Sequence, residues 1–151
     1  PKNHFGSLRG LITAIAAEGF RRHAAFMRDG LDATASRQDQ LRAAMIGYSR
    51  FAATHPHLFE LMFSPNYPDP NDPALQKAAA ESYAVLRRVS AGLDWDKTDT
   101  EGGALKTEMM LWSLVHGYSL LALAGQFTQP GRPGPVYGIE DIYPAFGYRD
   151  S

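Results

Sequence analysis

The side chains most capable of chemistry in this sequence are histidines and aromatic residues. The stretch LWSLVHGYSLL at residues 111–121 places Trp112 and His116 four residues apart, so on a helix they share one face. Next to a tyrosine such as Tyr48 or Tyr118, His116 could act as a general acid or base. No carboxylate or nucleophile stands in a pattern that would complete such a pair, so we expect no catalytic residues and no enzyme.

Motifs for metals and cofactors are missing from the sequence. His55 and His57 lie two residues apart across Pro56, and this spacing does not place them on one helix face as an i, i+4 metal pair requires. There is no cysteine, no glycine-rich phosphate loop, no HExxH motif and no calcium-binding loop. We therefore expect neither a metal nor a cofactor.

Length and composition favour one soluble domain. A chain of 151 residues with 44% hydrophobic residues can bury one sizeable core. The net charge of -1 shows no basic excess, so the bulk composition does not indicate a nucleic-acid binder. Ser113, His116 and Ser119 interrupt the longest apolar segment, and no signal peptide opens the chain. The absence of cysteine is compatible with a reducing compartment, and we expect a cytoplasmic protein without membrane contact.

The elements that must position these side chains are helices. Apolar residues recur at intervals of three and four, and no β-branched run alternates at period two, so the fold class is all-α. Ser7 and Asp72 are suitable N-caps, and Pro56 and Pro73 suit first helical turns. Proline and glycine predict loops at 64–73 and 126–138, and the tail 139–151 offers at most a short helix. The expected helices span 7–28, about 41–55, 56–63, 73–92 and 101–124.

The last long helix carries two different stripes. Leu105, Met109, Trp112, His116 and Leu123 gather on one side, and Ser113, Gly117, Leu120 and Ala124 form an adjoining stripe. Small side chains in the second stripe let another backbone approach closely, whereas Trp112 and His116 combine bulk with polar atoms. One side could therefore pack and the other could bind. The alternative that Trp112, His116 and the aromatic and methionine residues Tyr48, Phe51, Phe59 and Met62 are ordinary core stays open.

Three stretches carry a resemblance to a known family. KNHFGSLRGLITAIAAEGF, at residues 2–20, resembles the junction in TetR-family transcriptional regulators where the DNA recognition helix ends and the first core helix begins. Trp112, His116 and Gly117 resemble the Trp-His-Gly motif of one TetR C-terminal subgroup, and SRFAATHPHLFELMF resembles the segment before it. The matches occur in order and cover essentially the whole chain. The matching residues of the first stretch are Lys2, Asn3, His4, Phe5, Ser7, Leu11, Glu18, Gly19 and Phe20.

The resemblance implies a division of the chain. Residues 1–6 would end the recognition helix and form the junction, and residues 7–151 would be the ligand-binding and dimerisation domain, with the rest of the helix-turn-helix expected before residue 1. Lys2 stands where the family commonly has Tyr, and Arg9 replaces a frequent acidic residue. Lys2, His4 and Arg9 are candidates for contacts with DNA phosphates.

The resemblance also implies a bundle of five to six helices that forms a homodimer and holds a small apolar or aromatic effector. Effector binding would change operator affinity, by default as in a repressor, although the opposite sense is equally allowed. The alternative is a ligand-free helical dimerisation module with a filled core between Trp112 and Phe59. The expected dimer residues are Ser113, Gly117, Leu120, Leu121 and Ala124. The expected pocket, between the first, second, third and last helices, is lined by Phe20, His23, Met27, Tyr48, Phe59, Met62, Met109, Trp112 and His116.

Overall fold

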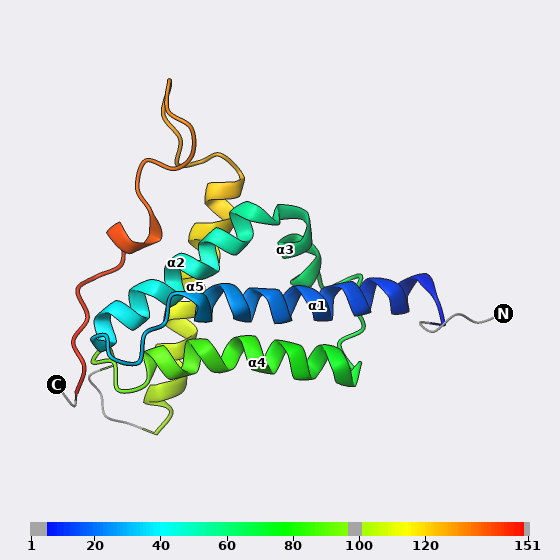
Figure 1. Ribbon diagram of the computed structural model, residues 1–151, viewed down its shortest axis with the longest axis horizontal. Coiled ribbons are helices and arrows are strands. Elements are labelled where there is room, and N and C mark those ends of the chain that lie inside the picture. Colours follow the sequence, from blue (N-terminus) through cyan, green and yellow to red (C-terminus); the bar gives the residue numbers. More distant parts are fainter. Residues whose placement is uncertain (1–5, 97–100, 150–151) are drawn as a thin grey trace.

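The computed structural model describes residues 6–96 and 101–149, and these fold into a bundle of five α-helices (Figure 1). Within the described part there is no strand, only two isolated bridges, so the predicted all-α class is confirmed. The elements are α1 Leu8–Asp29, α2 Arg37–Thr54, α3 Pro56–Met62, α4 Pro73–Ser90, α5 Gly103–Leu123 and the 3-10 helix η1 Ile139–Asp141.

The helices begin where the capping residues indicate. The Ser7 hydroxyl accepts a hydrogen bond of 2.9 Å from the Gly10 amide, and the Asp72 carboxylate accepts one of 2.9 Å from the amide of Leu75. Pro56 and Pro73 occupy the first turns of α3 and α4, where no amide hydrogen is needed. These helix starts therefore depend on residues next to them in the sequence.

Two long helices, α1 and α4, lie side by side, and α2 and α5 cross them (Figure 1). α1 makes its largest contacts with α4 and α2, and α2 in turn packs on α5. The largest fully buried side chains include Met27 from α1, Phe51 from α2, Phe59 from α3 and Leu111 from α5. One shared core thus joins all four of these helices.

The crossing of α1 and α2 is unusually close at Gly47. A Cβ atom on this residue would lie 2.2 Å from the carbonyl oxygen of Phe26 and 2.8 Å from the Cα of Met27. Both neighbours are backbone atoms of α1, so they cannot move aside as a flexible side chain could. The contact between α1 and α2 at this point therefore requires a glycine.

The N-terminal part of α1 extends beyond α4 (Figure 1). Leu8, Leu11 and Ile15 recur at the intervals of three and four that predict a buried apolar face, yet all three are exposed, Leu8 at 72%. The buried residues of α1 begin at Thr13 and become frequent from Ala16, so Leu8, Leu11 and Ile15 are not covered by the described residues.

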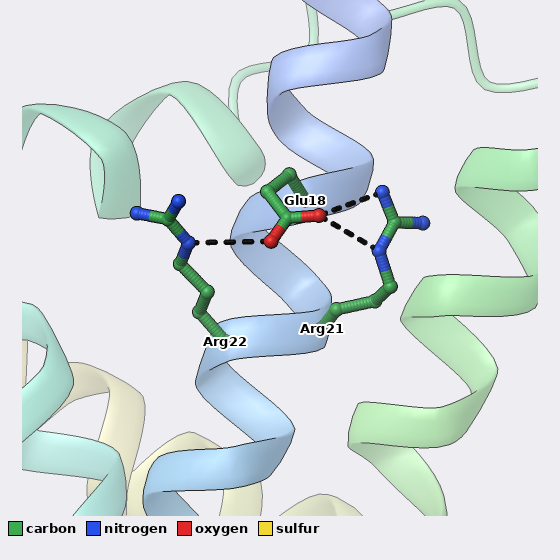
Figure 2. A network of polar contacts seen from close by, with 3 residues as sticks. All are labelled: Glu18, Arg21 and Arg22. Atoms are coloured by element: carbon green, nitrogen blue, oxygen red, sulfur yellow. Dashed lines mark hydrogen bonds and ion pairs between the residues drawn. The ribbon is translucent and has the colours of Figure 1, made fainter.

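Further along α1, a polar group occupies the outer surface. Figure 2 shows the Glu18 carboxylate between the guanidinium groups of Arg21 and Arg22, with oxygen–nitrogen distances of 2.9 and 3.3 Å. Hydrogen bonds from Arg21 and then from Arg22 lower the pKa of Glu18. Because all three side chains are about half exposed, the pairs contribute little stability, but they hold both arginines on the surface of α1.

α5 is buried on one side only. Leu111, Val115 and Tyr118 face the core, whereas the opposite side, which includes Leu120 and Leu121, is exposed. The sequence of α5 is apolar nearly all round after Met109, which is typical of a helix covered on every side, and the described chain covers one side of it. No helix among the described residues is long and apolar enough to cross a membrane.

The tail is more ordered than its weak helical pattern indicates. Beyond η1 it returns across the bundle, where Tyr148 forms an isolated bridge with Leu93. The Tyr148 hydroxyl lies 2.8 Å from the carbonyl oxygen of Val89, and the guanidinium of Arg37 lies 4.2 Å from the Tyr148 ring centroid. The tail therefore ties the end of α4 to the start of α2.

Replacing Gly47 with alanine should destabilise the fold by about 2–4 kcal/mol, because the methyl group must push the backbones of α1 and α2 apart. Urea unfolding measures this. Ala53→Gly, at an exposed position of the same helix, is the control and should cost only about 1 kcal/mol. If Gly47→Ala is as stable as the native protein, the close crossing does not exist.

Candidate functional site

A pocket of about 450 Å³ opens inside the bundle, within the range of small-molecule sites. Of its lining residues only Ala80 and Trp112 are exposed, so its mouth lies between α4 and α5. The remainder of the wall is buried or half-buried and mainly aromatic or aliphatic. The pocket is lined by Phe20, His23, Met27, Tyr48, Phe63, Ala79, Ala80, Ser82, Tyr83, Leu86 and Trp112.

Five of the nine residues predicted to line a pocket do so: Phe20, His23, Met27, Tyr48 and Trp112. The structure thus brings together residues from α1, α2 and α5 that lie up to 92 positions apart in the sequence.

The other four predicted residues lie outside the lining. Phe59 is fully buried in the core, and Met62 packs on Gly19 of α1, where its Sδ is 2.6 Å from the position of a Cβ. His116 lies behind the wall in contact with Tyr48. Met109 is 56% exposed, because the helical rotation that separates it from Trp112 carries it to the outer side of α5.

Tyr48 connects α2 with α5 through its hydroxyl group. The Trp112 indole donates a hydrogen bond of 3.1 Å to the Tyr48 oxygen, and Nδ1 of His116 lies 2.6 Å from the same oxygen. An indole nitrogen can only donate, so Tyr48 must accept from Trp112. Its own proton is then free to be donated to Nδ1 of His116. Burial lowers the pKa of His116 and raises that of Tyr48, so both are uncharged near neutral pH.

His23 is the most enclosed polar side chain of the wall, at 1% exposure. Its Nδ1 lies 2.6 Å from the Ser82 hydroxyl oxygen, and its ring meets the rings of Tyr48 and Phe51 edge to face at 4.3 and 5.2 Å. Burial, followed by the charge of His116, lowers the pKa of His23 to about 3. His23 is therefore neutral at physiological pH and presents no charge to the pocket.

At the α4 side of the pocket, Tyr83 donates a hydrogen bond of 2.5 Å to the carboxylate of Glu108. Arg87 lies over the Tyr83 ring at 5.1 Å and 3.8 Å from the same carboxylate. Burial and then the bond to Glu108 raise the pKa of Tyr83 to about 12. Arg87 and Glu108 thus form an ion pair next to the wall, and neither residue lines the pocket.

Comparison with known proteins assigns the chain. The family model "Tetracyclin repressor-like, C-terminal domain" matches residues 41–137. The chain belongs to this family. The match bears out the TetR resemblance at the level of the C-terminal domain, a family with regulatory rather than enzymatic roles.

Two further comparisons accompany this match. No curated protein matches the chain. A solved structure of a protein with unknown function from Rhodococcus sp. RHA1 is similar with a TM-score of 0.69 and 22% identity, over 92% of this chain and 69% of that chain. At this identity the likeness shows the fold alone.

In this tetracyclin repressor-like domain, the residues predicted for dimer contacts lie on the outer half of α5. Ser113, Leu120, Leu121 and Ala124 are exposed, and a Cβ at Gly117 would have no neighbour within 4 Å. Of the residues predicted to contact DNA, Arg9 is exposed in the first turn of α1. The other two, Lys2 and His4, lie outside the described residues.

Sequence reasoning missed the contribution of α4. Ala79, Ser82 and Leu86 recur at intervals of three and four along α4, a spacing typical of core residues, and Tyr83 lies next to them. The sequence carries one signal, the small side chains Ala79, Ala80 and Ser82 within about one turn of α4, and these line the same pocket as large aromatic residues from other helices. Small residues opposite large ones can close up or leave a void, and periodicity alone does not distinguish the two outcomes.

Acid should destabilise this domain through His23. The unfolded chain takes up a proton below about pH 6.5, whereas the folded histidine takes it up only near pH 3, so stability falls as the pH falls between these values. From pH 7 to pH 5 the loss attributable to His23 is about 2 kcal/mol. Urea unfolding at both pH values should show a smaller loss in His23→Phe, by about this amount. Equal losses in the two proteins would contradict a buried neutral His23.

Proposed function

We propose that this domain senses a small, largely apolar effector in the pocket and dimerises through α5, in the manner of a TetR-type regulator. Binding of the effector would change the operator affinity of a helix-turn-helix joined to the N-terminal end of α1. Repression relieved by the effector is the sense we propose.

The observation that carries the proposal is the pocket itself. A well-packed domain contains few voids larger than a water molecule, yet this pocket measures about 450 Å³ and its wall is mainly apolar. Its volume has ample room for a two-ring aromatic molecule such as naphthalene. An apolar wall of this kind is stabilised when a ligand replaces water.

Dimerisation is supported by the outer half of α5. From Met109 to Ala124 the helix carries no charged residue, although Trp112, Leu120 and Leu121 are exposed in the single chain. A continuous uncharged surface of this length is typical of a protein–protein interface. We propose a second copy of the same helix as the partner, because a two-fold axis through this surface would place the small residues Ser113 and Gly117 of both copies together.

Two helices could connect the pocket with the rest of a regulator. Trp112 lines the pocket and, at 38% exposure, also stands at the edge of the outer half of α5. α1 contributes Phe20, His23 and Met27 to the wall and carries the exposed Leu8 at its other end. A ligand that moves Trp112 or α1 would alter both the dimer and the N-terminal end of α1.

The alternative of a ligand-free dimerisation module has one observation in its favour. Between Phe59 and Trp112 the space is filled, with His116 centred 5.0 Å from Phe59 and Phe63 centred 4.5 Å from His116. The pocket lies on the α4 side of this aromatic group, where the module hypothesis predicts no void. We therefore prefer the sensing function.

The purely apolar probe 2-methylnaphthalene tests the pocket. In a Trp95→Phe background Trp112 is the sole tryptophan, and its fluorescence should change on binding with a dissociation constant on the order of 10–100 µM. Ala79→Phe, which fills the pocket, should abolish the signal. The matched control Ala84→Phe, exposed on the same helix, should keep it.

Absence of binding to the Trp95→Phe protein, or equal binding to Ala79→Phe and Ala84→Phe, would contradict a ligand site in this pocket.

A further inference from the structure

The hydrogen-bond donors of the pocket wall are already committed to partners within the protein. Trp112 donates to Tyr48 at 3.1 Å, Tyr83 donates to Glu108 at 2.5 Å, and the Tyr48 proton has His116 as its acceptor at 2.6 Å. A ligand that accepts hydrogen bonds finds none of these protons available.

Ser82 is the position where the direction of a hydrogen bond matters most. If Ser82 donates to Nδ1 of His23, only the Nε2 hydrogen of His23 is left without an acceptor among the described residues. If His23 donates instead, both Nε2 and the Ser82 proton are left without partners. The first arrangement leaves fewer buried groups unsatisfied, so Ser82 donates and His23 accepts.

The Nε2 hydrogen of His23 is closed off from the pocket. The atom is inaccessible to water, and the ring meets the faces or edges of Tyr48 and Phe51 at right angles within 5.2 Å. An N–H group in such a cluster is partly satisfied by the neighbouring π systems.

The oxygen of Ser82 is therefore a polar contact that remains for a ligand. It lines the pocket, and in the described structure no hydrogen bond to either of its lone pairs is present. Donation to His23 also polarises the hydroxyl group and makes its oxygen a better acceptor. The Tyr48 oxygen is a weaker choice, since it already accepts from Trp112.

The wall of the pocket has no charged side chain that could pair with a charged ligand. None of its residues is an acid, a lysine or an arginine, and His23 is uncharged at neutral pH. Arg21 and Arg22, which precede His23 on α1, are held on the surface by Glu18 (Figure 2). A charged ligand would lose its hydration without gaining an opposite charge.

We propose that the pocket selects an uncharged aromatic molecule bearing an O–H or N–H group, which donates a hydrogen bond to the Ser82 oxygen while His23 fixes the orientation of that hydroxyl. This deepens the proposed function and rests on it. His23 is a positioning residue, and Ser82 is the specificity-determining contact.

Four naphthalene derivatives separate the features of the ligand: 2-methylnaphthalene is apolar, 2-naphthol donates and accepts, 2-methoxynaphthalene only accepts, and 2-naphthoate is an anion. Titration of the Trp95→Phe protein at neutral pH should show 2-naphthol binding at least about fivefold more tightly than 2-methoxynaphthalene. Apolar burial alone would favour 2-methoxynaphthalene, which has the larger apolar surface, so tighter binding of 2-naphthol requires a polar contact. The anion should bind at least about 50-fold more weakly than 2-naphthol.

Two variants test the roles of the residues. In Ser82→Ala, 2-naphthol should lose its preference over the ether to within about twofold, while the affinity for 2-methylnaphthalene stays within about twofold. In His23→Phe the Ser82 proton is released, so the preference should disappear because the ether binds more tightly. Ser90→Ala is the matched control, since Ser90 is a buried serine of the same helix that bonds to Arg87 and does not line the pocket.

The remaining outcomes contradict different parts of the proposal. If the three neutral probes bind equally, or if Ser82→Ala keeps the preference for 2-naphthol, the hydrogen-bond assignment fails and the sensing function stands. If 2-naphthoate binds as tightly as 2-naphthol, the selection for uncharged ligands fails. If no probe binds, the pocket is not a ligand site, and the proposed function fails with it.

Discussion

The close approach of α1 and α2 at Gly47 is the constraint on which the rest of the domain depends. Because this residue has no side chain, the backbone of α2 lies directly against that of α1. The next residue, Tyr48, is thereby brought within 4.3 Å of the His23 ring and close enough to α5 to bond with Trp112 and His116. One missing Cβ thus determines where three helices meet and where the wall of the pocket stands.

The helical framework could be predicted from the sequence, but the void could not. Capping by Ser7 and Asp72 depends on neighbouring residues only, so the sequence states it directly. The role of Ser82 depends on its contact with His23 of α1, which the sequence of α4 does not reveal. The helical periodicity of α4 predicts only that Ser82 is buried. For Met109 the periodicity predicted a pocket-lining position, but the side chain is exposed because one half of α5 is not covered by the described chain.

The polar groups of the pocket form a consistent set once the protons are assigned. Tyr48, Ser82 and Tyr83 each give their proton to a partner within the protein, and burial keeps His23 and His116 neutral. These bonds hold the aromatic wall in place and leave the Ser82 oxygen without a donor among the described residues. The same contacts that stabilise the fold would therefore determine the proposed ligand chemistry.

In the proposed mechanism, a ligand in the pocket changes the distance between the two copies of α1 in a dimer. The chain has no cysteine, so Leu8→Cys introduces a single site for a spin label at an exposed position of α1. Double electron–electron resonance then measures the distance between the two labels with and without saturating 2-naphthol. We predict a dipolar coupling whose distance distribution shifts when 2-naphthol binds. An unchanged distribution, or no coupling between labels, would contradict the account.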